Sequence, residues 1–292
     1  QRLGEPNLAE RLRNDNLLGS AWLRTTANHT RFNAADGQLD VGTHHSMLQV
    51  GTDLAKWGQD SRGLAGVMVA TGKSTTQSTS NLTGYGAKGT VNGTALGLYA
   101  TWFQSPAEQT GAYVDAWVQA SRFKNTMQGD ALARERYDSS ALTASVEAGY
   151  AFKVREGANS ALYVEPQAQV TWTDFSMDTH VEGNGTQVRS VDAGGLQSRL
   201  GVRVYGHDTA AGGNRVQPFV GVNWIRARGE GNSLALNETY VAGGQPRDTY
   251  EAKAGAQLQL GGGWTGWGEL STTRGKGDYT NYGAQLGVKH SW

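Results

Sequence analysis

The stretch AYVDAWVQAS, residues 112–121, decides the fold because it alternates between two kinds of side chain along its whole length. Its even positions carry only Ala and Val, whereas its odd positions carry Tyr, Asp, Trp, Gln and Ser. Successive side chains of a β-strand point to opposite faces of a sheet, so this stretch predicts a strand with one apolar and one largely polar face.

The same period of two returns in five further stretches, at residues 142–153, 162–172, 199–204, 251–260 and 284–289. With weaker matches included, the pattern predicts about twelve strands. Their centres are expected near Trp22, Val50, Val67, Leu98, Ala116, Val146, Ala168, Val202, Val220, Ala256, Trp267 and Leu286. No linker, repeat or low-complexity tract divides the 292 residues, and the 41 Gly, nine Trp and eleven Tyr suit many strands joined by turns, so we expect one all-β domain.

Some stretches depart from this alternation. Residues 64–71 are apolar at both even and odd positions. Near residues 216–225 the pattern puts Phe219 and Ile225 on the polar side. Pro166 and Pro218 lie inside predicted strands, where a proline removes a ladder hydrogen bond. We therefore expect β-bulges at both prolines.

The connections between the predicted strands alternate in length. The long ones lie at residues 28–40, 73–89, 125–138, 176–186 and 229–248, and the short ones at 56–62, 105–109, 154–159, 206–213 and 261–263. Only residues 275–278 break this order. Long loops on one rim and short turns on the other are typical of an outer-membrane β-barrel, with the long loops outside the cell and the turns in the periplasm.

The hydropathy of the chain is compatible with such a barrel. The longest apolar run has about seven residues, far fewer than the ~20 that a transmembrane helix needs, but a membrane-spanning strand exposes only every second residue to lipid. A soluble β-sandwich or propeller is the alternative, and its outer face is usually rich in Lys and Glu. Here the polar face carries Gln, Thr, Ser and Gly with isolated charges, which favours a water-filled lumen.

Charge and cysteine content exclude some classes of function. Lys plus Arg equals Asp plus Glu at 26 each, so no net field attracts nucleic acid, and the absence of Cys excludes disulfides and thiolate metal sites. The chain also begins without Met or a signal peptide, so we expect a processed part of a longer protein.

The first stretch, QRLGEPNLAERLRNDN (residues 1–16), is the one place where a helix fits better than a strand. It is short and amphipathic, so it would be marginal alone in water. We expect residues 1–18 to form a pore plug inside a barrel of residues 19–292. The predicted plug contacts are Leu3, Leu8, Glu10, Arg11, Leu12 and Arg13.

Residues of the predicted polar face are candidates to line the pore. They are Asp53, Asp115, Gln119, Glu147, Glu165, Arg199, Arg203, Glu251 and Lys253. The alternative role for each of the charged ones is cross-strand pairing within the wall.

Short motifs along the chain carry a family resemblance by their order and spacing. They are RLGE (2–5), GSAWLR (19–24), LQVGTDL (48–54), GAYVDAWVQASRF (111–123), EAGYAF (147–152), YVEPQAQVTW (163–172), RLGVR (199–203), QPFVGVNW (217–224) and the final GVKHSW. The chain resembles the translocator β-domain of bacterial autotransporters, and within it the AIDA-type adhesins.

The resemblance implies a twelve-stranded barrel with a helical segment in its pore, which anchors an N-terminal passenger in the outer membrane and permits its secretion. The implied partners are that passenger, outer-membrane lipid, periplasmic chaperones and the outer-membrane assembly machinery, with no cofactor. A terminal aromatic preceded by alternating apolar residues is the implied assembly signal, here Leu286, Val288 and Trp292.

The sequence also departs from the family pattern. Many members continue the RLGE-type motif directly into Leu-Arg, whereas Pro6 and Asn7 intervene here, and many end in Phe rather than Trp. Some members cut off the passenger at an Asn-Asn junction inside the pore. No such dipeptide occurs here, so we expect no catalytic residues.

Other functions rest on weaker patterns. Gly72-Lys73-Ser74 lacks the upstream Gly and the following helix of a P-loop, and His44 and His45 point to opposite faces of a predicted strand, so they cannot share a metal ion. An outer-membrane enzyme would need an acid–His pair, for which Asp178 and His180 on a long loop are the candidates. A passive porin differs from an autotransporter domain by lacking the plug.

Overall fold

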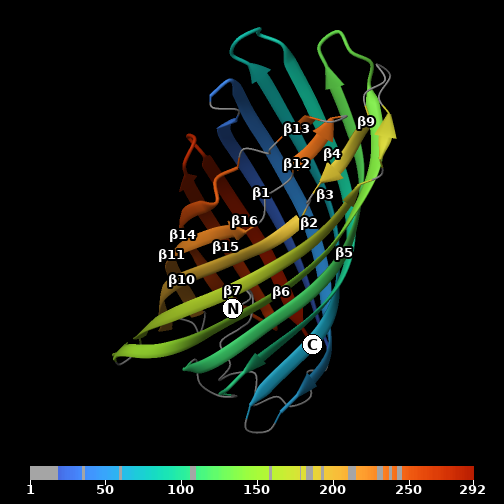
Figure 1. The fold of residues 1–292 in the computed structure, drawn as a ribbon. Coiled ribbons are helices and arrows are strands. Elements are labelled where there is room, and N and C mark those ends of the chain that lie inside the picture. Colours follow the sequence, from blue (N-terminus) through green and yellow to red (C-terminus); the bar gives the residue numbers. More distant parts are fainter. Residues whose placement is uncertain are drawn as a thin grey trace.

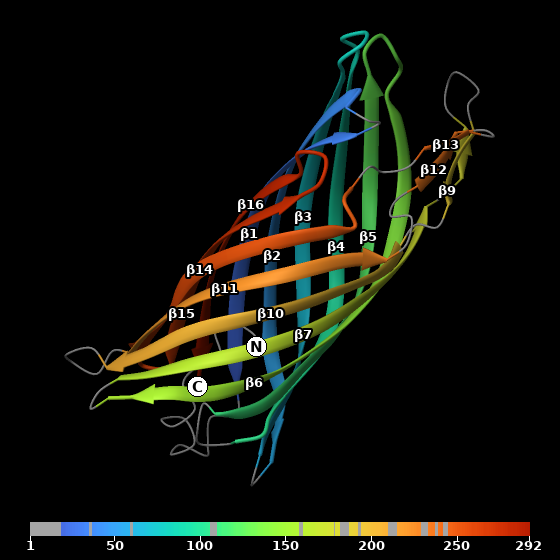
Figure 2. The same ribbon diagram turned by 60° about the vertical axis from the view of Figure 1, so that its left-hand side comes forward.

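A computed structural model of the chain shows twelve antiparallel strands in a closed barrel (Figure 1, Figure 2). The structure describes residues 19–34, 37–58, 61–105, 110–157, 160–177, 179–181, 187–191, 194–209, 215–228, 233–236, 239–241 and 245–292. No helix among these residues is long and apolar enough to cross a membrane.

The barrel strands follow one another around the wall in chain order. They are β1 (Ser20–Ala34), β2 (Leu39–Trp57), β3 (Arg62–Ser80), β4 (Gly86–Phe103), β5 (Gly111–Gly129), β6 (Glu135–Glu156), β7 (Ser160–Met177), β10 (Gly194–Thr209), β11 (Arg215–Arg228), β14 (Asp248–Gly261), β15 (Trp264–Gly275) and β16 (Thr280–Ser291). Every predicted strand centre lies within one of these strands, so the predicted twelve-stranded all-β barrel is confirmed.

The first and last strands close the barrel. β1 pairs with β16 from Ser20↔Ser291 to Arg31↔Thr280, and the ladder continues through backbone hydrogen bonds between Gly19 and Trp292. Closure satisfies the backbone groups of both edge strands, which would otherwise each cost several kcal/mol in hydrocarbon.

The alternation read from residues 112–121 gives the wall its two faces. Val114 and Val118 are exposed on the outside of β5, whereas Asp115 and Ser121 are buried on the inside. The outside of the other strands exposes large apolar side chains as well, among them Leu48, Leu96, Leu98, Val146, Leu200, Val222, Leu270 and Leu286. An exposed apolar surface that runs around the whole molecule requires lipid rather than water as its neighbour.

The strands are longer than a membrane crossing requires, which overturns three of the predicted long loops. β3 has 19 residues and β6 has 22, and the hairpins joining β3 to β4 and β5 to β6 rise furthest at one rim (Figure 1). At ~3.3 Å per residue such strands exceed the ~25 Å apolar band of an outer-membrane barrel. The predicted loops at residues 28–40, 73–89 and 125–138 are therefore mostly strand. Outside the band both faces meet water, so the alternation that identifies a strand is lost.

Short extra strands lie in or directly after two other predicted loops, residues 176–186 and 229–248. β8 (His180–Val181) and β9 (Gln187–Val191) follow β7, and β12 (Ser233–Leu236) and β13 (Thr239–Val241) follow β11. The four form a separate sheet in the order β13-β12-β9-β8, beyond the same rim of the barrel (Figure 2). The sequence analysis missed this sheet because each strand is too short to show a period.

The β-bulges predicted at Pro166 and Pro218 are wrong. The register of β6 with β7 skips two pairs beside Pro166 and resumes unchanged, and that of β10 with β11 does the same beside Pro218. Loss of one proline N–H thus interrupts the ladder locally without shifting it. The register shifts that do occur lie between Asp53 and Ala55, Lys153 and Arg155, and Gln259 and Gly261.

Aromatic clusters inside the barrel explain the stretches that are apolar at unexpected positions. Leu64 and Met68 of the doubly apolar stretch 64–71 pack inside with Trp22, Tyr99, Phe103, Tyr113 and Trp267. Phe219 belongs to a second interior cluster with Ala151, Tyr163 and Tyr205. The inner face of β3 and β11 is thus partly a packed core.

Several interior rings lie against a glycine of the next strand. The Trp22 ring covers Gly51, the Tyr113 ring covers Gly149 and the Trp267 ring covers Gly287, each where a Cβ atom would overlap the ring. Glycine allows these rings to approach the backbone of the wall, and the ring in turn shields a strand position that has no side chain.

Candidate functional site

The interior of the barrel collects the polar residues that the sequence analysis assigned to the pore. All nine of them are buried or partly buried on the face opposite to the apolar outside. Nearly all of the charged ones contact other groups of the wall, and four of them, Asp53, Glu147, Arg199 and Glu251, belong to two networks.

The first network centres on Asp53 at the seam of the barrel. Lys289 Nζ lies 2.8 Å from Asp53 Oδ2, and the Tyr99 hydroxyl donates to Asp53 Oδ1 at 2.6 Å. The Ser20 hydroxyl donates to the same carboxylate, and Trp22 Nε1 donates to the Tyr99 oxygen at 2.9 Å. The side chains of Asp53 and Lys289 are 1% and 3% exposed. This network joins β2 to β1, β4 and β16, the strands around the closure.

The second network centres on Glu147 and Arg199. Arg199 Nη2 lies 2.5 Å from Glu147 Oε2, and the Tyr113 hydroxyl donates to Glu147 Oε1 at 2.7 Å. Arg199 also donates to Asn223 at 2.9 Å, and Asn223 donates to Glu251 at 2.6 Å. Gln167 and Gln169 accept two further bonds from the guanidinium. The network crosses the lumen-facing side of β5, β6, β7, β10, β11 and β14.

The remaining predicted pore residues have neighbours within the wall too. Glu165 accepts a hydrogen bond from Gln167 at 2.7 Å, and the Arg203 guanidinium lies 4.3 Å from the centre of the Phe219 ring. Lys253 lies 3.5 Å from Glu269. The Thr101 hydroxyl donates to Asp115, and Gln119 donates to Ser121 at 3.2 Å. Cross-strand pairing, the alternative named for the charged residues, therefore engages most of them.

The other predicted sites lie at the ends of the chain or beyond its described part. The plug residues of 1–18 and Asp178 lie outside the described residues, as does the side chain of His180. On β16, Leu286 points outward and is exposed, and Val288 lies two residues further on the same face. Trp292 is 55% exposed, with its ring stacked on His290 at 5.6 Å between centres.

Sequence reasoning missed the partners that complete the first network. Lys289 lies on the polar face of its predicted strand, so period two alone could have placed it inside. Its pairing with Asp53, 236 residues away, depends on the closure register, which no local pattern encodes. Nothing in the sequence around Tyr99 or Ser20 indicated that its hydroxyl donates to Asp53, because both residue types are common in strands.

Two histidines also pair in a way that the sequence did not show. His44 and His45 lie on opposite faces of β2, as predicted. His44 instead stacks on His29 of β1, with 4.1 Å between ring centres and 3.1 Å between the two Nδ1 atoms. Among the described residues, no group of three or more His, Cys, Asp or Glu side chains could hold a metal ion.

This closed barrel with a charged, cross-linked interior matches known proteins along its length. The family described as "Autotransporter beta-domain" matches residues 21–271. The chain belongs to the autotransporter β-domain family. It is thus a translocator domain of the bacterial outer membrane.

Relatives and solved structures agree with this assignment. The autotransporter β-domain is 35% identical over its full length to the uncharacterized protein YdeU of Escherichia coli K12, of which it spans 65%. It is 29% identical over 94% of its length to the autotransporter adhesin AIDA-I of Escherichia coli, of which it spans 22%. The crystal structure of the AIDA-I transport unit has the same fold, with a TM-score of 0.86, 24% identity and coverage of 98% of this chain and 95% of that one. The chain spans less than two thirds of these curated relatives.

Proposed function

We propose that this autotransporter β-domain anchors an N-terminal passenger in the outer membrane and lets it reach the cell surface through, or with the help of, the barrel. The observation that carries the proposal is the position of the two barrel ends. Gly19 and Trp292 hydrogen-bond to each other, so the chain that precedes β1 starts from the same rim at which β16 ends. An upstream passenger therefore starts at this rim, and the lumen is the direct route from there to the opposite rim.

The rim that bears Gly19 and Trp292 is proposed to face the periplasm. It carries the short turns, such as Gly261–Trp264, whereas the opposite rim carries the tall hairpins and the four-stranded sheet. Short periplasmic turns and larger extracellular structures are the usual arrangement in barrels of this class. Thiol labelling of the Thr83→Cys variant in intact cells checks this orientation, because the chain has no other Cys.

The size of the barrel limits what can pass. Twelve strands ~4.8 Å apart and tilted by ~40° give a backbone radius of roughly 12 Å, and the interior side chains narrow it further. An α-helix is ~10–12 Å across, so one helix or one extended hairpin nearly fills the bore. The passenger is proposed to cross unfolded. The name of AIDA-I suggests an adhesin as the passenger, and we propose no enzymatic step for the domain itself.

Residues 1–18 are proposed to plug the pore after transport, with the interior carboxylates and guanidinium groups as contacts. Deletion of residues 1–18 is expected to raise single-channel conductance severalfold, because the lumen then holds only water and wall side chains. Planar-bilayer recording of the full chain and the deletion variant measures this. Replacement of the same residues by a Gly/Ser segment of equal length is the control for chain length. Equal conductance of the full chain and the deletion variant would favour a passive porin.

The last strand is proposed to carry the signal for the assembly machinery in Leu286, Val288 and Trp292. Deletion of Trp292 is expected to cut the yield of assembled barrel in cells by about tenfold and to lower the stability of barrels refolded in detergent much less. It removes only the last two backbone hydrogen bonds of the closure and a ring that is 55% exposed. Trp292→Phe, which keeps an aromatic end, is the matched control and should assemble normally. Heat-dependent gel migration of outer-membrane fractions reports the yield. Wild-type yield from the deletion would leave Trp292 only an interfacial role.

A further inference from the structure

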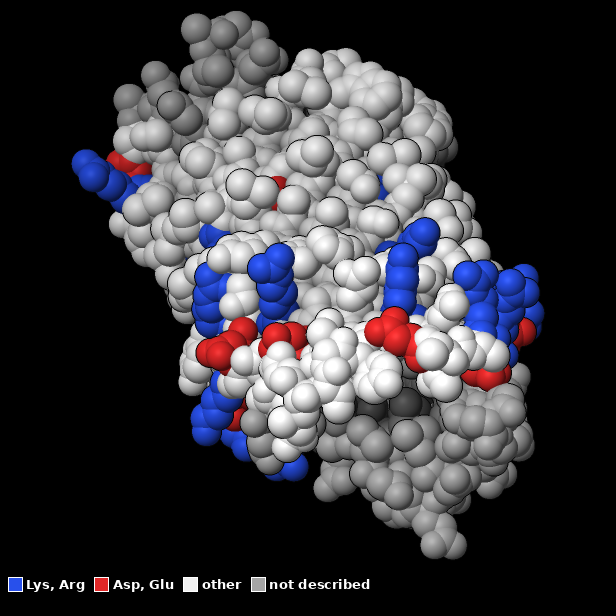
Figure 3. Space-filling view, turned by 90° about the horizontal axis from the view of Figure 1, so that it is seen from above, with Lys and Arg blue, Asp and Glu red and all other residues white. Residues whose placement is uncertain are grey.

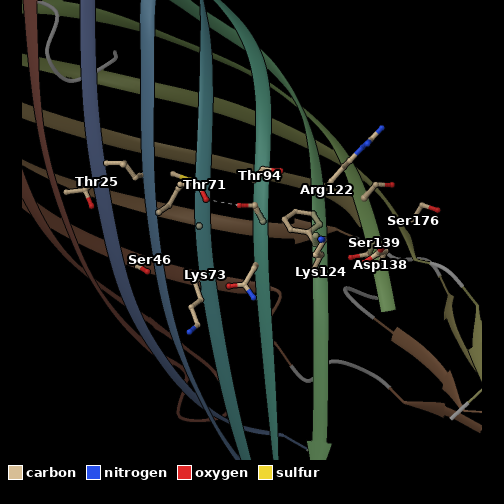
Figure 4. A pocket seen from close by; sticks show the side chains of 17 residues that line it. Thr25, Ser46, Thr71, Lys73, Thr94, Arg122, Lys124, Asp138, Ser139 and Ser176 are labelled. Atoms are coloured by element: carbon tan, nitrogen blue, oxygen red, sulfur yellow. Dashed lines mark hydrogen bonds between the residues drawn. The ribbon is translucent and has the colours of Figure 1, made fainter. Parts of the chain in front are cut away.

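A hollow of about 980 Å³ lies on the outer wall of the barrel across β3, β4 and β5. Most of its lining side chains point away from the lumen, and three of them are cations: Lys73 of β3, and Arg122 and Lys124 of β5 (Figure 4). Hydroxyl and amide groups of Thr71, Asn92 and Thr94 form the floor between them, and Ser140 of β6 lies beside Arg122.

Strand register fixes the spacing of the three cations. Lys73 pairs with Asn92, and Asn92 pairs with Lys124, so the two lysines lie in one row two strands apart. Two strand spacings put the backbone positions of Lys73 and Lys124 about 10 Å apart, and Arg122 lies about 7 Å from Lys124 along β5. The cations thus surround a polar floor of the width of one or two phosphate groups.

The three cations are available to bind a ligand. Lys73, Arg122 and Lys124 are exposed, and none of them makes a hydrogen bond or ion pair with another described residue. Asp138 lies opposite Lys124 in the register of β5 and β6, and it is the only anion among the described residues that line the hollow. The lining therefore keeps a net positive charge. Seen from above, Lys and Arg stand out at several points of a mostly uncharged surface, with Asp and Glu close to most of them (Figure 3).

The hollow lies at the edge of the apolar belt. The row of Arg122 continues through Thr94 and Thr71, and the next row towards the other rim is Ala120, Leu96 and Val69. Leu96 and Val69 are 62% and 52% exposed, as expected for side chains that face acyl chains. A lipid whose chains cover these residues has its headgroup at the level of the cations.

We propose that Lys73, Arg122 and Lys124 bind the phosphates of an anionic lipid in the leaflet next to the hairpin rim. Guanidinium and ammonium groups with neighbouring hydroxyls are the donors that phosphate oxygens require. Continuity with the belt favours a lipid over a free anion, because acyl chains hold the headgroup in place while the cations bind it. With the orientation proposed above, the leaflet is the outer one, and the ligand is a phosphorylated lipid of the cell surface.

Native mass spectrometry of the full chain in a zwitterionic detergent tests the site, with diphosphoryl lipid A as the probe and phosphatidylcholine as the comparison. The triple variant Lys73→Gln, Arg122→Gln, Lys124→Gln is expected to weaken lipid A binding by roughly 10- to 100-fold, as the loss of three cations near a lipid surface implies. The control variant Lys88→Gln, Arg136→Gln, Lys276→Gln also removes three positive charges near the same rim, but outside the hollow. The affinity of this variant for lipid A should stay within about threefold of the wild-type value.

Three results would overturn the site. Equal loss in both triple variants would show diffuse attraction, equal binding of phosphatidylcholine would remove the need for an anionic headgroup, and displacement of lipid A by millimolar inorganic phosphate would indicate a free-anion site. None of these assays depends on secretion or sidedness. The binding assays can support the lipid site while labelling of the Thr83→Cys variant reports the opposite orientation. In that case the lipid site stands and the proposed sidedness is wrong.

Discussion

Replacement of Asp53 by Leu is expected to lower the free energy of unfolding of the barrel by about 3–5 kcal/mol, because it removes the carboxylate that pairs with the buried Lys289 ammonium. Lys289 is 3% exposed, and its Nζ lies 2.8 Å from the Asp53 carboxylate. Two hydroxyl donors, from Ser20 and Tyr99, lose their acceptor as well. Urea titration of barrels in detergent, followed by the heat-dependent gel shift, gives the free energy.

A double-mutant cycle separates charge from packing in this network. Lys289→Met together with Asp53→Leu replaces the pair by apolar side chains and should recover most of the lost stability, as is common for buried ion pairs. The control is Glu269→Gln, whose partner Lys253 is 20% exposed and 3.5 Å away. It should cost clearly less than Asp53→Leu, because Gln keeps the shape and polarity of Glu and Lys253 keeps some contact with water. If the double variant is as unstable as Asp53→Leu alone, the carboxylate acts mainly through Ser20 and Tyr99.

The membrane-spanning part of this fold was predictable because lipid and lumen impose opposite requirements on alternate residues. Val118 and Gln119 are neighbours in the chain. Their even and odd positions in the strand alone predict that Val118 is exposed to lipid and that Gln119 faces the interior. Six segments with this alternation, together with weaker matches elsewhere, predicted the fold, and the resemblance of the motifs indicated the family. The same reason explains why the strand ends were not predicted. Where β3 extends beyond the apolar belt into TGKSTTQSTS (residues 71–80), both of its faces contact water, so its sequence resembles that of a loop.

For the interior networks, the sequence predicted which residues face the lumen but not which residues contact each other. Parity placed Glu147 and Arg199 inside, but their contact joins β6 to β10 across β7 and depends on side-chain reach over the curved wall. Asp53 and Lys289 meet only because the last strand closes on the first. A local pattern gives the face of each residue, and the closed topology then decides its partner. The polar interior of this barrel therefore mainly stabilises the wall, because most of its charged side chains already bind groups of neighbouring strands.

Two Arg substitutions at neighbouring positions give the sharpest test of the two faces. Val118→Arg is expected to destabilise the barrel by about 2–4 kcal/mol, because a guanidinium on the lipid face near the midplane of the bilayer must be desolvated or must deform the membrane. Val118 lies between Leu98 and Ala144 in its row, so its neighbours on that face in the two adjacent strands are apolar.

Gln119→Arg is the matched control, since it places the same side chain one residue away on the inner face. Gln119 is partly buried and donates to Ser121 at 3.2 Å, in a region that also holds Thr143 across the ladder. The guanidinium can remain hydrated there, so we expect a loss below about 1 kcal/mol. Urea titration in lipid vesicles measures both variants, because a detergent micelle reshapes around a charge more readily than a bilayer does. Equal losses would mean that the wall does not separate lipid from an aqueous interior at β5, and the translocator proposal would lose its physical basis.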